Sequence, residues 1–306
     1  MVRVVVVGSI HMDFYVKVPR IPRPGETVLG SGFIMSPGGK GANQAVGAAR
    51  LGAETYMVGR VGKDWLGNAL IDNFRANGVN SEYVMQDPSI HTGVAFILLE
   101  ESGENAIAVA PGADSRVAKE DVDRALDIIK SSQILLLQLE IPVDTVVYAA
   151  KRAWEVGVRV VLNPAPAMRL PDEIFRYVSV LTPNRIELAM LTNTRIEEYS
   201  ELVSAAKILL KKGVRYVVVT LGAQGALIVG HDYTELVPAY RVKVVDTTGA
   251  GDAFNAALAV FLAEGRDIRE AVKLANAAAA LKIMKLGAQS GLPRRDELES
   301  FIAMYK

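Results

Sequence analysis

The residues whose types and spacing best suit chemistry lie near position 250. The segment Asp246–Phe254 (DTTGAGDAF) precedes an apolar stretch that is typical of a buried helix. The backbone N–H groups of Gly249, Ala250 and Gly251 would point out of that helix N-terminus, where the helix dipole also favours an anion. Asp252 is then either a helix-cap residue or a general base that deprotonates a substrate hydroxyl while the amides hold a transferred phosphoryl group.

A second glycine-rich segment, Gly38–Ala45 (GGKGANQA), opens a predicted helix after a proline-rich stretch. It is not a Walker loop, because the G-x-x-x-x-G-K-[ST] pattern is absent. The first predicted strand is not followed by G-x-G-x-x-G either, so a dinucleotide-binding interpretation is weak. Paired glycines here could serve simple turn geometry, but Lys40 and Asn43 add hydrogen-bonding groups that suit a polyhydroxy ligand.

Composition excludes several other kinds of site. The 306 residues include no Cys and only 3 His, which removes disulfides, thiolate metal sites and cysteine nucleophiles and makes a histidine-rich metal site unfavourable. Lys plus Arg and Asp plus Glu balance at 34 each, which argues against a general nucleic-acid or electrostatic membrane binder. The absence of Cys fits a reducing, cytoplasmic setting, and no apolar run reaches the ~20 residues of a membrane span.

The elements that must position these residues alternate along the chain. Short apolar strands are separated by helix-period segments, which predicts an α/β fold with a mostly parallel sheet covered by helices on both faces. The predicted strands are Val4–Val7, Ile134–Leu139, Arg159–Leu162, Val178–Leu181, Tyr216–Thr220, Ala226–Val229 and Val242–Val245. The predicted helices are Ala42–Leu51, Leu66–Asn77, Lys119–Lys130, Val143–Glu155 and Glu201–Lys212.

Two stretches interrupt the alternation. Phe14–Ser36 is rich in Pro and Gly with β-type residues between them, and Thr92–Ala110 has the pattern of a hairpin with its turn at residues 100–105. They form either two unrelated surface hairpins or one small β lid that excludes water from the chemistry. We expect the lid, with residues 14–38 and 92–110 in it and residues 1–13, 39–91 and 111–306 in the α/β core.

Together these motifs resemble the signatures of the ribokinase (pfkB) family of carbohydrate kinases. The resemblance rests on the two glycine segments and on shorter markers that follow in order over nearly the whole chain. These markers are Gly8-Ser9-Ile10-x-x-Asp13, Pro24-Gly25-Glu26-Thr27, Gln138-Leu139-Glu140, Asn163-Pro164-Ala165-Pro166, Thr182-Pro183-Asn184-x-x-Glu187 and Thr220-Leu221-Gly222-x-x-Gly225. Lys40 followed by Gly-Ala-Asn-Gln most resembles the ribokinases within that family. The resemblance implies a three-layer α/β/α fold with a small β-sheet lid.

The resemblance also implies roles for individual residues. Asp252 would be the catalytic base, with Gly249, Ala250 and Gly251 as the anion hole. The residues implied to bind the sugar are His11, Asp13, Gly38, Gly39, Lys40, Asn43, Glu140 and Asp252. Those implied to bind ATP are Asn184, Thr220, Leu221, Gly222, Ala223, Gln224, Gly225, Gly251 and Asn276. Without the resemblance, Glu187 is equally a solvated helix charge and Asn276 an ordinary polar helix residue.

Two cations follow from the same resemblance. Glu187 would organise Mg²⁺ through water, which suits an ion that keeps several of its waters. An activating K⁺ would be bound, largely by main-chain oxygens, beside the anion hole. The implied K⁺ site comprises Asp246, Thr248, Lys282, Lys285, Gly287 and Gly291. Some relatives have Ser in place of Gly291, a change that a backbone ligand would tolerate.

One residue departs from the family pattern. Relatives that phosphorylate ribose typically have Asn between the first Gly-Ser and the Asp, where this chain has His11. His11 either simply ends a strand or faces the sugar, where it can still donate and accept hydrogen bonds. Because sites that hydrogen-bond a hydroxyl discriminate strongly, this change could alter acceptor preference.

We therefore expect an ATP-dependent kinase for the 5-hydroxyl of D-ribose. The alternatives are a kinase of the same family for a nucleoside, fructose or another sugar or polyol, and a sugar-binding regulator on the same fold. The retained Asp252 argues against the regulator, because binding alone does not require a base. We expect no nucleic-acid or membrane partner, and a homodimer that pairs through the edge of the lid.

Overall fold

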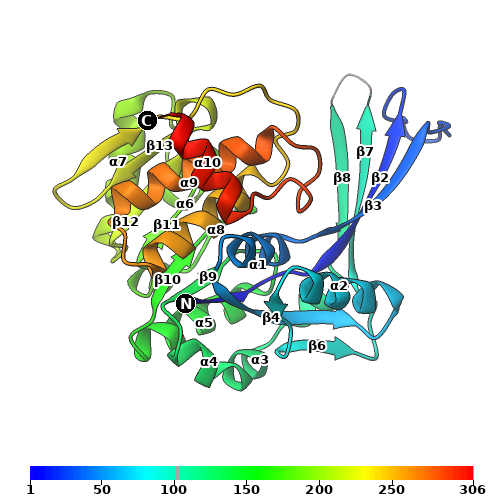
Figure 1. Cartoon of the computed structure of the whole chain (residues 1–306), viewed down its shortest axis with the longest axis horizontal. Coiled ribbons are helices and arrows are strands. Elements are labelled where there is room, and N and C mark those ends of the chain that lie inside the picture. The colour runs from blue at the N-terminus through cyan, green and yellow to red at the C-terminus, as the bar shows by residue number, and fades with distance from the viewer. Residues whose placement is uncertain (101–103, 306) are drawn as a thin grey trace.

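The computed structural model describes residues 1–100 and 104–305, which form two sheets with helices around the larger one (Figure 1). The larger sheet has 10 strands in the order β14-β13-β12-β11-β10-β9-β1-β4-β5, with β6 paired to β4. All its neighbours are parallel except β12–β13 and β13–β14. Its strands are β1 (Arg3–Val7), β4 (Glu54–Gly62), β5 (Val79–Asn80), β6 (Val84–Asp87), β9 (Ile134–Leu137), β10 (Arg159–Leu162), β11 (Val180–Leu181), β12 (Tyr216–Thr220), β13 (Ala226–Val229) and β14 (Thr234–Val237).

Helices cover both faces of this sheet, and β1 shows why. Val4 and Val6 belong to one buried cluster with the helices α1, α8 and α9, whereas Val5 and Val7 belong to a second cluster with α5 and α7. Alternate side chains of a strand point to opposite faces, so four consecutive valines fill two cores. The helices are α1 (Lys40–Arg50), α2 (Trp65–Ala76), α3 (Lys119–Arg124), α4 (Leu126–Lys130), α5 (Val143–Glu155), α6 (Arg185–Thr192), α7 (Tyr199–Lys211), α8 (Ala250–Ala263), α9 (Ile268–Ile283) and α10 (Arg295–Met304).

The smaller sheet has four strands in the order β3-β2-β7-β8 and projects from the helical body (Figure 1). We call it the lid sheet: β2 (His11–Val18), β3 (Gly32–Gly38), β7 (Gly93–Glu100) and β8 (Asn105–Ala110). The two stretches without helical pattern therefore join in one sheet, because β2 and β7 pair side by side from His11↔Gly93 to Val18↔Glu100. The expected hairpin turn includes residues 101–103, which lie outside the described residues.

Two expected elements are absent or divided in the structure, and the strands expected at Ile134–Leu139 and Val178–Leu181 are shorter, Ile134–Leu137 and Val180–Leu181. Val242–Val245 is not a strand: the amides of Val245 and Asp246 both donate to the Ile283 carbonyl oxygen instead of to a neighbouring strand. The single expected helix over 119–130 is two short helices, because the Ala125 amide donates to the carbonyl three residues back and tightens the turn there. No helix in the described part of the chain is both long and apolar enough to cross a membrane.

Candidate active site

The N-terminus of α8 carries the acid that the sequence singles out. Gly249 caps the helix with φ 77°, a left-handed conformation that glycine adopts without strain. Asp252 lies in the first turn and is buried. A Cβ added at Gly251 would meet no protein atom within 4 Å, so packing within the protein does not require glycine there. This leaves the backbone at the helix end open to a ligand.

The backbone amides at this helix end are not equivalent. The Ala250 amide donates to the Thr247 carbonyl oxygen at 3.1 Å, and the Ala253 amide donates to that of Gly249 at 2.9 Å. Within the described chain, the amides of Gly249 and Gly251 make no hydrogen bond. Of the three amides expected in the anion hole, that of Ala250 is engaged, whereas those of Gly249 and Gly251 are available to an anion; the Asp252 amide likewise makes no hydrogen bond within the described residues.

Two amide side chains from α1 hold the Asp252 carboxylate. Asn43 Nδ2 donates to Oδ2 at 2.8 Å, and Gln44 Nε2 donates to Oδ1 at 3.0 Å. Helix α1 can approach α8 this closely because Gly47 lacks a side chain: a Cβ there would lie 2.8 Å from the Cβ of Ala256. The glycine-rich segment Gly38–Ala45 thus positions Asp252, the acid of the segment Asp246–Phe254.

Gln44 is a site residue that sequence analysis missed. Its Oε1 accepts from Gln138 Nε2 at 2.6 Å, and its Nε2 also lies 3.1 Å from Asn163 Oδ1. These contacts tie α1 to the segments that follow β9 and β10, at the carboxyl ends of the central strands. Its position directly after Asn43 was the signal in the sequence that could have found it.

Burial and charge act in opposite directions on the acid. Burial raises the pKa of Asp252, whereas the Lys40 ammonium and the amides of Gln44 and Asn43 lower it, and the net shift is upward. For Lys40, burial lowers the pKa, but the carboxylates around it, first that of Asp252, raise it overall. The site therefore pairs a charged ammonium with a carboxylate that is a better proton acceptor than an exposed aspartate.

Beside the acid lies a group of polar atoms with unused hydrogen-bonding capacity. Glu140 Oε2 accepts from Ser9 Oγ at 2.6 Å and from the Lys40 amide at 2.9 Å. Asp13 Oδ1 and Asn43 Oδ1 are buried and have no hydrogen-bond partner in the described structure. Buried acceptors are normally satisfied, so these two atoms indicate a ligand that brings hydroxyl or amine donors.

Glycines keep this space open. A Cβ at Gly38 would lie 2.3 Å from Asp13 Oδ1, and one at Gly39, whose φ is 91°, would lie 2.8 Å from the Ser9 carbonyl oxygen. A side chain at Gly38 would therefore occupy the position next to Asp13 Oδ1, the carboxylate oxygen that has no hydrogen-bond donor in the described structure. The structure thus brings the expected sugar-binding residues together around Asp252.

His11 lies in this group, between two acids. Its Nδ1 is 3.3 Å from Asp114 Oδ2 and its Nε2 is 3.5 Å from Asp13 Oδ1. Burial lowers the pKa of His11, but the hydrogen bond to Asp114 and the charges of Glu140, Asp114 and Asp13 outweigh it and raise the pKa to about 9. His11 is therefore an imidazolium at neutral pH. Asp114, which also accepts from the Ile10 amide at 2.7 Å, is a second residue that sequence analysis missed.

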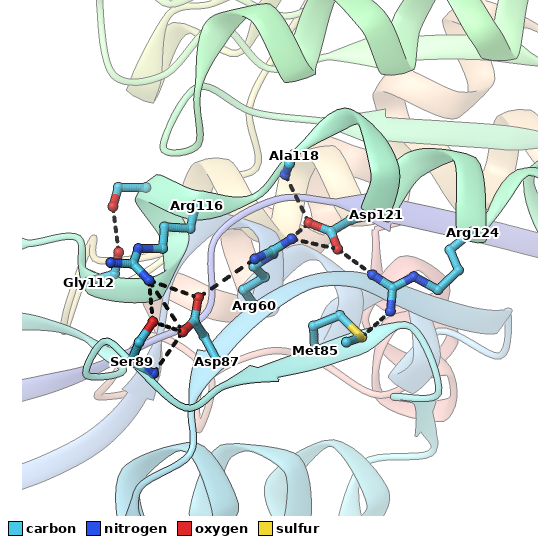
Figure 2. A network of polar contacts seen from close by, with 10 residues as sticks. Arg60, Met85, Asp87, Ser89, Gly112, Arg116, Ala118, Asp121 and Arg124 are labelled. Carbon is cyan, nitrogen blue, oxygen red and sulfur yellow. Dashed lines mark hydrogen bonds and ion pairs between the residues drawn. The ribbon is translucent and has the colours of Figure 1, made fainter.

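A network of ion pairs fixes the turn that carries Asp114 (Figure 2). This turn, Gly112–Arg116, is a short 3₁₀ helix, η1, after β8. Arg116 bonds to Asp87 at the end of β6, and Asp87 also lies 3.6 Å from Arg60 of β4. Arg60 in turn pairs with the buried Asp121 of α3 at 2.7 Å. The network joins η1, the turn that follows the last strand of the lid sheet, to β4, β6 and α3. It thereby fixes the position of Asp114 beside His11.

Most of the expected nucleotide-binding residues lie after β11 and between β12 and β13, whereas Gly251 belongs to α8 and Asn276 to α9. Asn184 caps α6 and forms a reciprocal pair with Glu187: the Glu187 amide donates to Asn184 Oδ1 and the Asn184 amide donates to Glu187 Oε2, each at 2.8 Å. Asn184 also bridges to Thr220, next to the short 3₁₀ helix η3 (Gly222–Gln224). The exposed residues of this turn are Gly222, Ala223 and Gln224.

Asn276 reaches the same region from α9. Its Nδ2 donates to the carbonyl oxygens of Val237 at 3.0 Å and Pro238 at 3.2 Å. Gly225, whose φ is 101°, approaches the same segment so closely that a Cβ would lie 2.1 Å from the Val237 oxygen. Asn276 Nδ2 therefore holds the loop after β14 near the turn that Gly225 ends, while its Oδ1 makes no hydrogen bond within the described residues.

The residues of the expected monovalent-cation site also come together, but an ammonium occupies the centre. Lys282 Nζ donates to the carbonyl oxygens of Asp246 at 2.9 Å and Lys285 at 3.3 Å, and it lies 3.5 Å from Asp246 Oδ2. The Lys282 side chain is fully buried. These oxygens already surround a positive charge, so the site does not fit a free K⁺ ion in addition.

Comparisons with known proteins identify the family of the chain. The family model described as "pfkB family carbohydrate kinase" matches residues 1–295. The chain belongs to the pfkB family of carbohydrate kinases. The ribokinase of Bacillus subtilis (strain 168) is 42% identical over 97% of this chain and 98% of its own, and the deoxyribokinase of Salmonella typhi is 36% identical over 98% and 99%. A structure of Arabidopsis thaliana ribokinase with ribose and ATP superposes with a TM-score of 0.92, at 34% identity over 99% of both chains.

Family membership confirms the expected fold class and the expected enzyme class. This pfkB-family chain is a kinase that uses an alcohol group as acceptor. Its large, mostly parallel sheet and its smaller sheet match those of the ribokinase structures. Its differences from the expected site are the engaged Ala250 amide, the His11–Asp114 pair and the Lys282 ammonium.

Proposed function

We propose that this kinase transfers the γ-phosphoryl group of ATP to the 5-hydroxyl of D-ribose in the cytoplasm. The observation that carries the proposal is the buried Asp252 at an open helix N-terminus, beside buried acceptors that receive no hydrogen bond within the described residues. The Asp252 carboxylate serves as the general base, and the N-terminus of α8 binds the transferred phosphoryl group. Asp13 and Asn43 accept hydrogen bonds from sugar hydroxyls. We propose ribose as the acceptor because ribokinases are similar to this chain over nearly its whole length.

The residues of this chain divide the work of phosphoryl transfer. The Asp252 carboxylate accepts the proton of the 5-hydroxyl while that oxygen bonds to the γ-phosphorus and the bond to the ADP oxygen breaks. The amides of Gly249 and Gly251, with the dipole of α8, stabilise the charge on the transferred group. Asn43 and Gln44 keep the carboxylate oriented before and during the transfer.

Glu187 fits an indirect role toward Mg²⁺. Its Oε2 is held by the Asn184 amide, while within the described residues Oε1 makes no hydrogen bond. Burial raises the pKa of Glu187, and the Lys40 charge lowers it. The described part of the chain has no cluster of three acidic or histidine side chains that would bind a metal directly. Bound with ATP, Mg²⁺ neutralises phosphate charge, and Glu187 would contact its water ligands.

The lid sheet supplies the second wall of the sugar site. Asp13 belongs to β2, and its face of the sheet includes Ala95 and Ile97, which are buried. Sugar binding would bring this face closer to α8 and exclude water from Asp252. We propose that residues 14–38 and 92–110 form this lid and that residues 1–13, 39–91 and 111–306 form the core.

A second acceptor class has a specific observation in its favour. The His11–Asp114 pair places an imidazolium where ribose-specific relatives typically carry an amide, and a deoxyribokinase is 36% identical to this chain. An imidazolium donates but does not accept hydrogen bonds, so acceptor preference could move to a pentose that lacks one hydroxyl, or to another sugar or nucleoside.

A coupled assay of ADP formation tests both proposals. With a panel of D-ribose, 2-deoxyribose, fructose and nucleosides, we expect the highest kcat/KM for ribose, and a higher value for any other acceptor would replace ribose as the substrate.

In the same assay Asp252→Asn should lose about 10²–10⁴-fold in kcat while it still binds ribose. Near-normal turnover by a folded Asp252→Asn protein would contradict the role of this acid.

A further inference from the structure

The positive charge at the expected K⁺ site belongs to the polypeptide, as the ammonium of Lys282. Two segments of the chain meet at this site. One contains Asp246, which precedes the anion-binding turn, and the other is the loop from Lys285 to Gly291, which follows α9. Asp246 Oδ1 accepts from the Thr248 amide at 2.9 Å and Oδ2 accepts from the Gly287 amide at 2.8 Å. The loop's geometry therefore sets the geometry of Gly249 and Gly251.

The side chain of Lys282 ends at the centre of this loop. Its ammonium has three donors and faces three oxygens, the carbonyls of Asp246 and Lys285 and the Asp246 carboxylate. Carbonyl oxygens are also what a monovalent cation uses in proteins. A buried ammonium without such partners would be strongly unfavourable, so the lysine and the oxygens satisfy one another.

The neighbouring loop has room for this lysine because of a glycine. A Cβ at Gly291 would lie 3.0 Å from Lys282 Cε and 2.9 Å from the Gly287 carbonyl oxygen. Both distances are shorter than a Cβ atom normally keeps from a neighbouring heavy atom. A larger residue at position 291 would therefore push the lysine side chain away from the loop, so Lys282 and Gly291 form a matched pair.

We propose that the ammonium of Lys282 replaces a free monovalent cation in this kinase, so that phosphoryl transfer does not require K⁺. The inference rests on the proposed function, since it concerns the anion-binding turn that serves it. Lys282 is a positioning residue: it carries the loop's positive charge to a fixed place near Gly249 and Gly251. Among the described residues, its ammonium contacts only oxygens of Asp246 and Lys285.

Cation replacement and rescue test the proposal. Wild-type kcat/KM for the sugar should differ less than twofold between buffers of KCl, NaCl and choline chloride at equal ionic strength. Lys282→Ala should lose at least tenfold in choline chloride and recover most of that loss in KCl, because K⁺ can occupy the emptied site. Lys273→Ala, which removes an exposed lysine of the same helix, should behave like the wild type in every buffer.

Melting temperature gives a readout that needs no turnover. KCl should raise the melting temperature of Lys282→Ala, or of the closer isostere Lys282→Met, above its value in choline chloride, and leave that of the wild type unchanged. Severalfold activation of the wild type by K⁺ would overturn the proposal, as would a folded Lys282→Ala that is fully active in choline or not rescued by K⁺. Absence of turnover with ribose in all buffers would instead contradict the proposed function, and the thermal measurement would still decide the role of Lys282.

Discussion

At the scale of single residues, this kinase uses buried charges that are matched within a few ångströms. His11 lies between Asp13 and Asp114, and Lys282 lies against Asp246. Removing one partner from such a pair leaves a buried charge without compensation, which typically costs about 3–5 kcal/mol. Both cations are therefore expected to be essential for the geometry around them, although neither transfers a proton in the proposed reaction.

The His11 group predicts a pH dependence for sugar binding. Burial raises the pKa of Asp13 to about 6 although the charge of His11 lowers it, and the pKa of His11 is raised to about 9. Below pH about 6 Asp13 gains a proton and becomes a poorer acceptor for sugar hydroxyls. Above about 9 His11 loses its charge and the acids beside it lose their compensation. We expect the KM for the sugar to be lowest between these limits, measured as initial rates from pH 5 to 10.

Paired variants separate the two limits. His11→Asn combined with Asp114→Asn removes a positive and a negative charge together, so the rise in KM near pH 9 should disappear. Without His11 the pKa of Asp13 should increase, which moves the lower limit to higher pH. His231→Asn removes an exposed histidine and should leave the profile unchanged. An unchanged upper limit in the double variant would contradict the role of His11.

The residues that sequence analysis missed share one property. Asp114 contacts His11 across 103 positions, and Gln44 contacts Gln138 across 94. Neither contact follows from a local spacing pattern, because it exists only after distant segments of the chain are folded together. Asp252, by contrast, was predictable because its glycines and its helix are adjacent to it in the chain.

At the scale of elements, the two glycines at the N-terminus of α8 are glycines for different physical reasons. At Gly251 a Cβ would meet no protein atom within 4 Å, whereas Gly249 has φ 77°. Gly251→Ala should keep the melting temperature or raise it slightly, yet lose at least tenfold in kcat because the methyl group lies where the phosphoryl group approaches.

Gly249→Ala serves as the comparison for this prediction. It should lower the free energy of unfolding by about 1–2 kcal/mol, because a side chain is strained in the left-handed region. Thermal unfolding and steady-state rates of both variants provide the test. A Gly251→Ala enzyme with normal kcat would show that no group binds close to this backbone.

Most strands and helices followed from local pattern, and the exceptions have physical reasons. The predicted strands Arg159–Leu162, Tyr216–Thr220 and Ala226–Val229 agree with the structure, because runs of buried β-branched residues are typical of a sheet covered on both faces. Val242–Val245 has the same composition, but Val244 and Val245 are each 55% exposed and have no neighbouring strand. Local composition predicts that a segment prefers the extended conformation. It does not predict whether a neighbouring strand is available to pair with that segment.

At the scale of the whole molecule, the lid sheet leaves an apolar face uncovered. Alternate residues of β2 point to opposite sides, so Phe14 lies on the face away from Asp13. On that face Phe14 stacks with Phe33 at 6.1 Å and with Phe96 at 5.4 Å between ring centroids. Phe33 is 61% exposed and Phe96 53% exposed. Exposed apolar groups of this kind mark interaction surfaces, and we propose that a second copy of the chain covers them.

The homodimer is therefore expected to depend on these aromatic side chains. Analytical ultracentrifugation of the wild type should show a dimer at micromolar concentration, and Phe33→Ser with Phe96→Ser should shift it to monomer without loss of the core fold. Because the lid sheet would lose the support of its partner, the KM for the sugar should rise severalfold while kcat changes less. Trp154→Ser removes an aromatic residue that is 56% exposed on α5 and should leave the dimer intact. A wild-type monomer at these concentrations would show that the lid works without a partner, and its apolar face would then need another occupant.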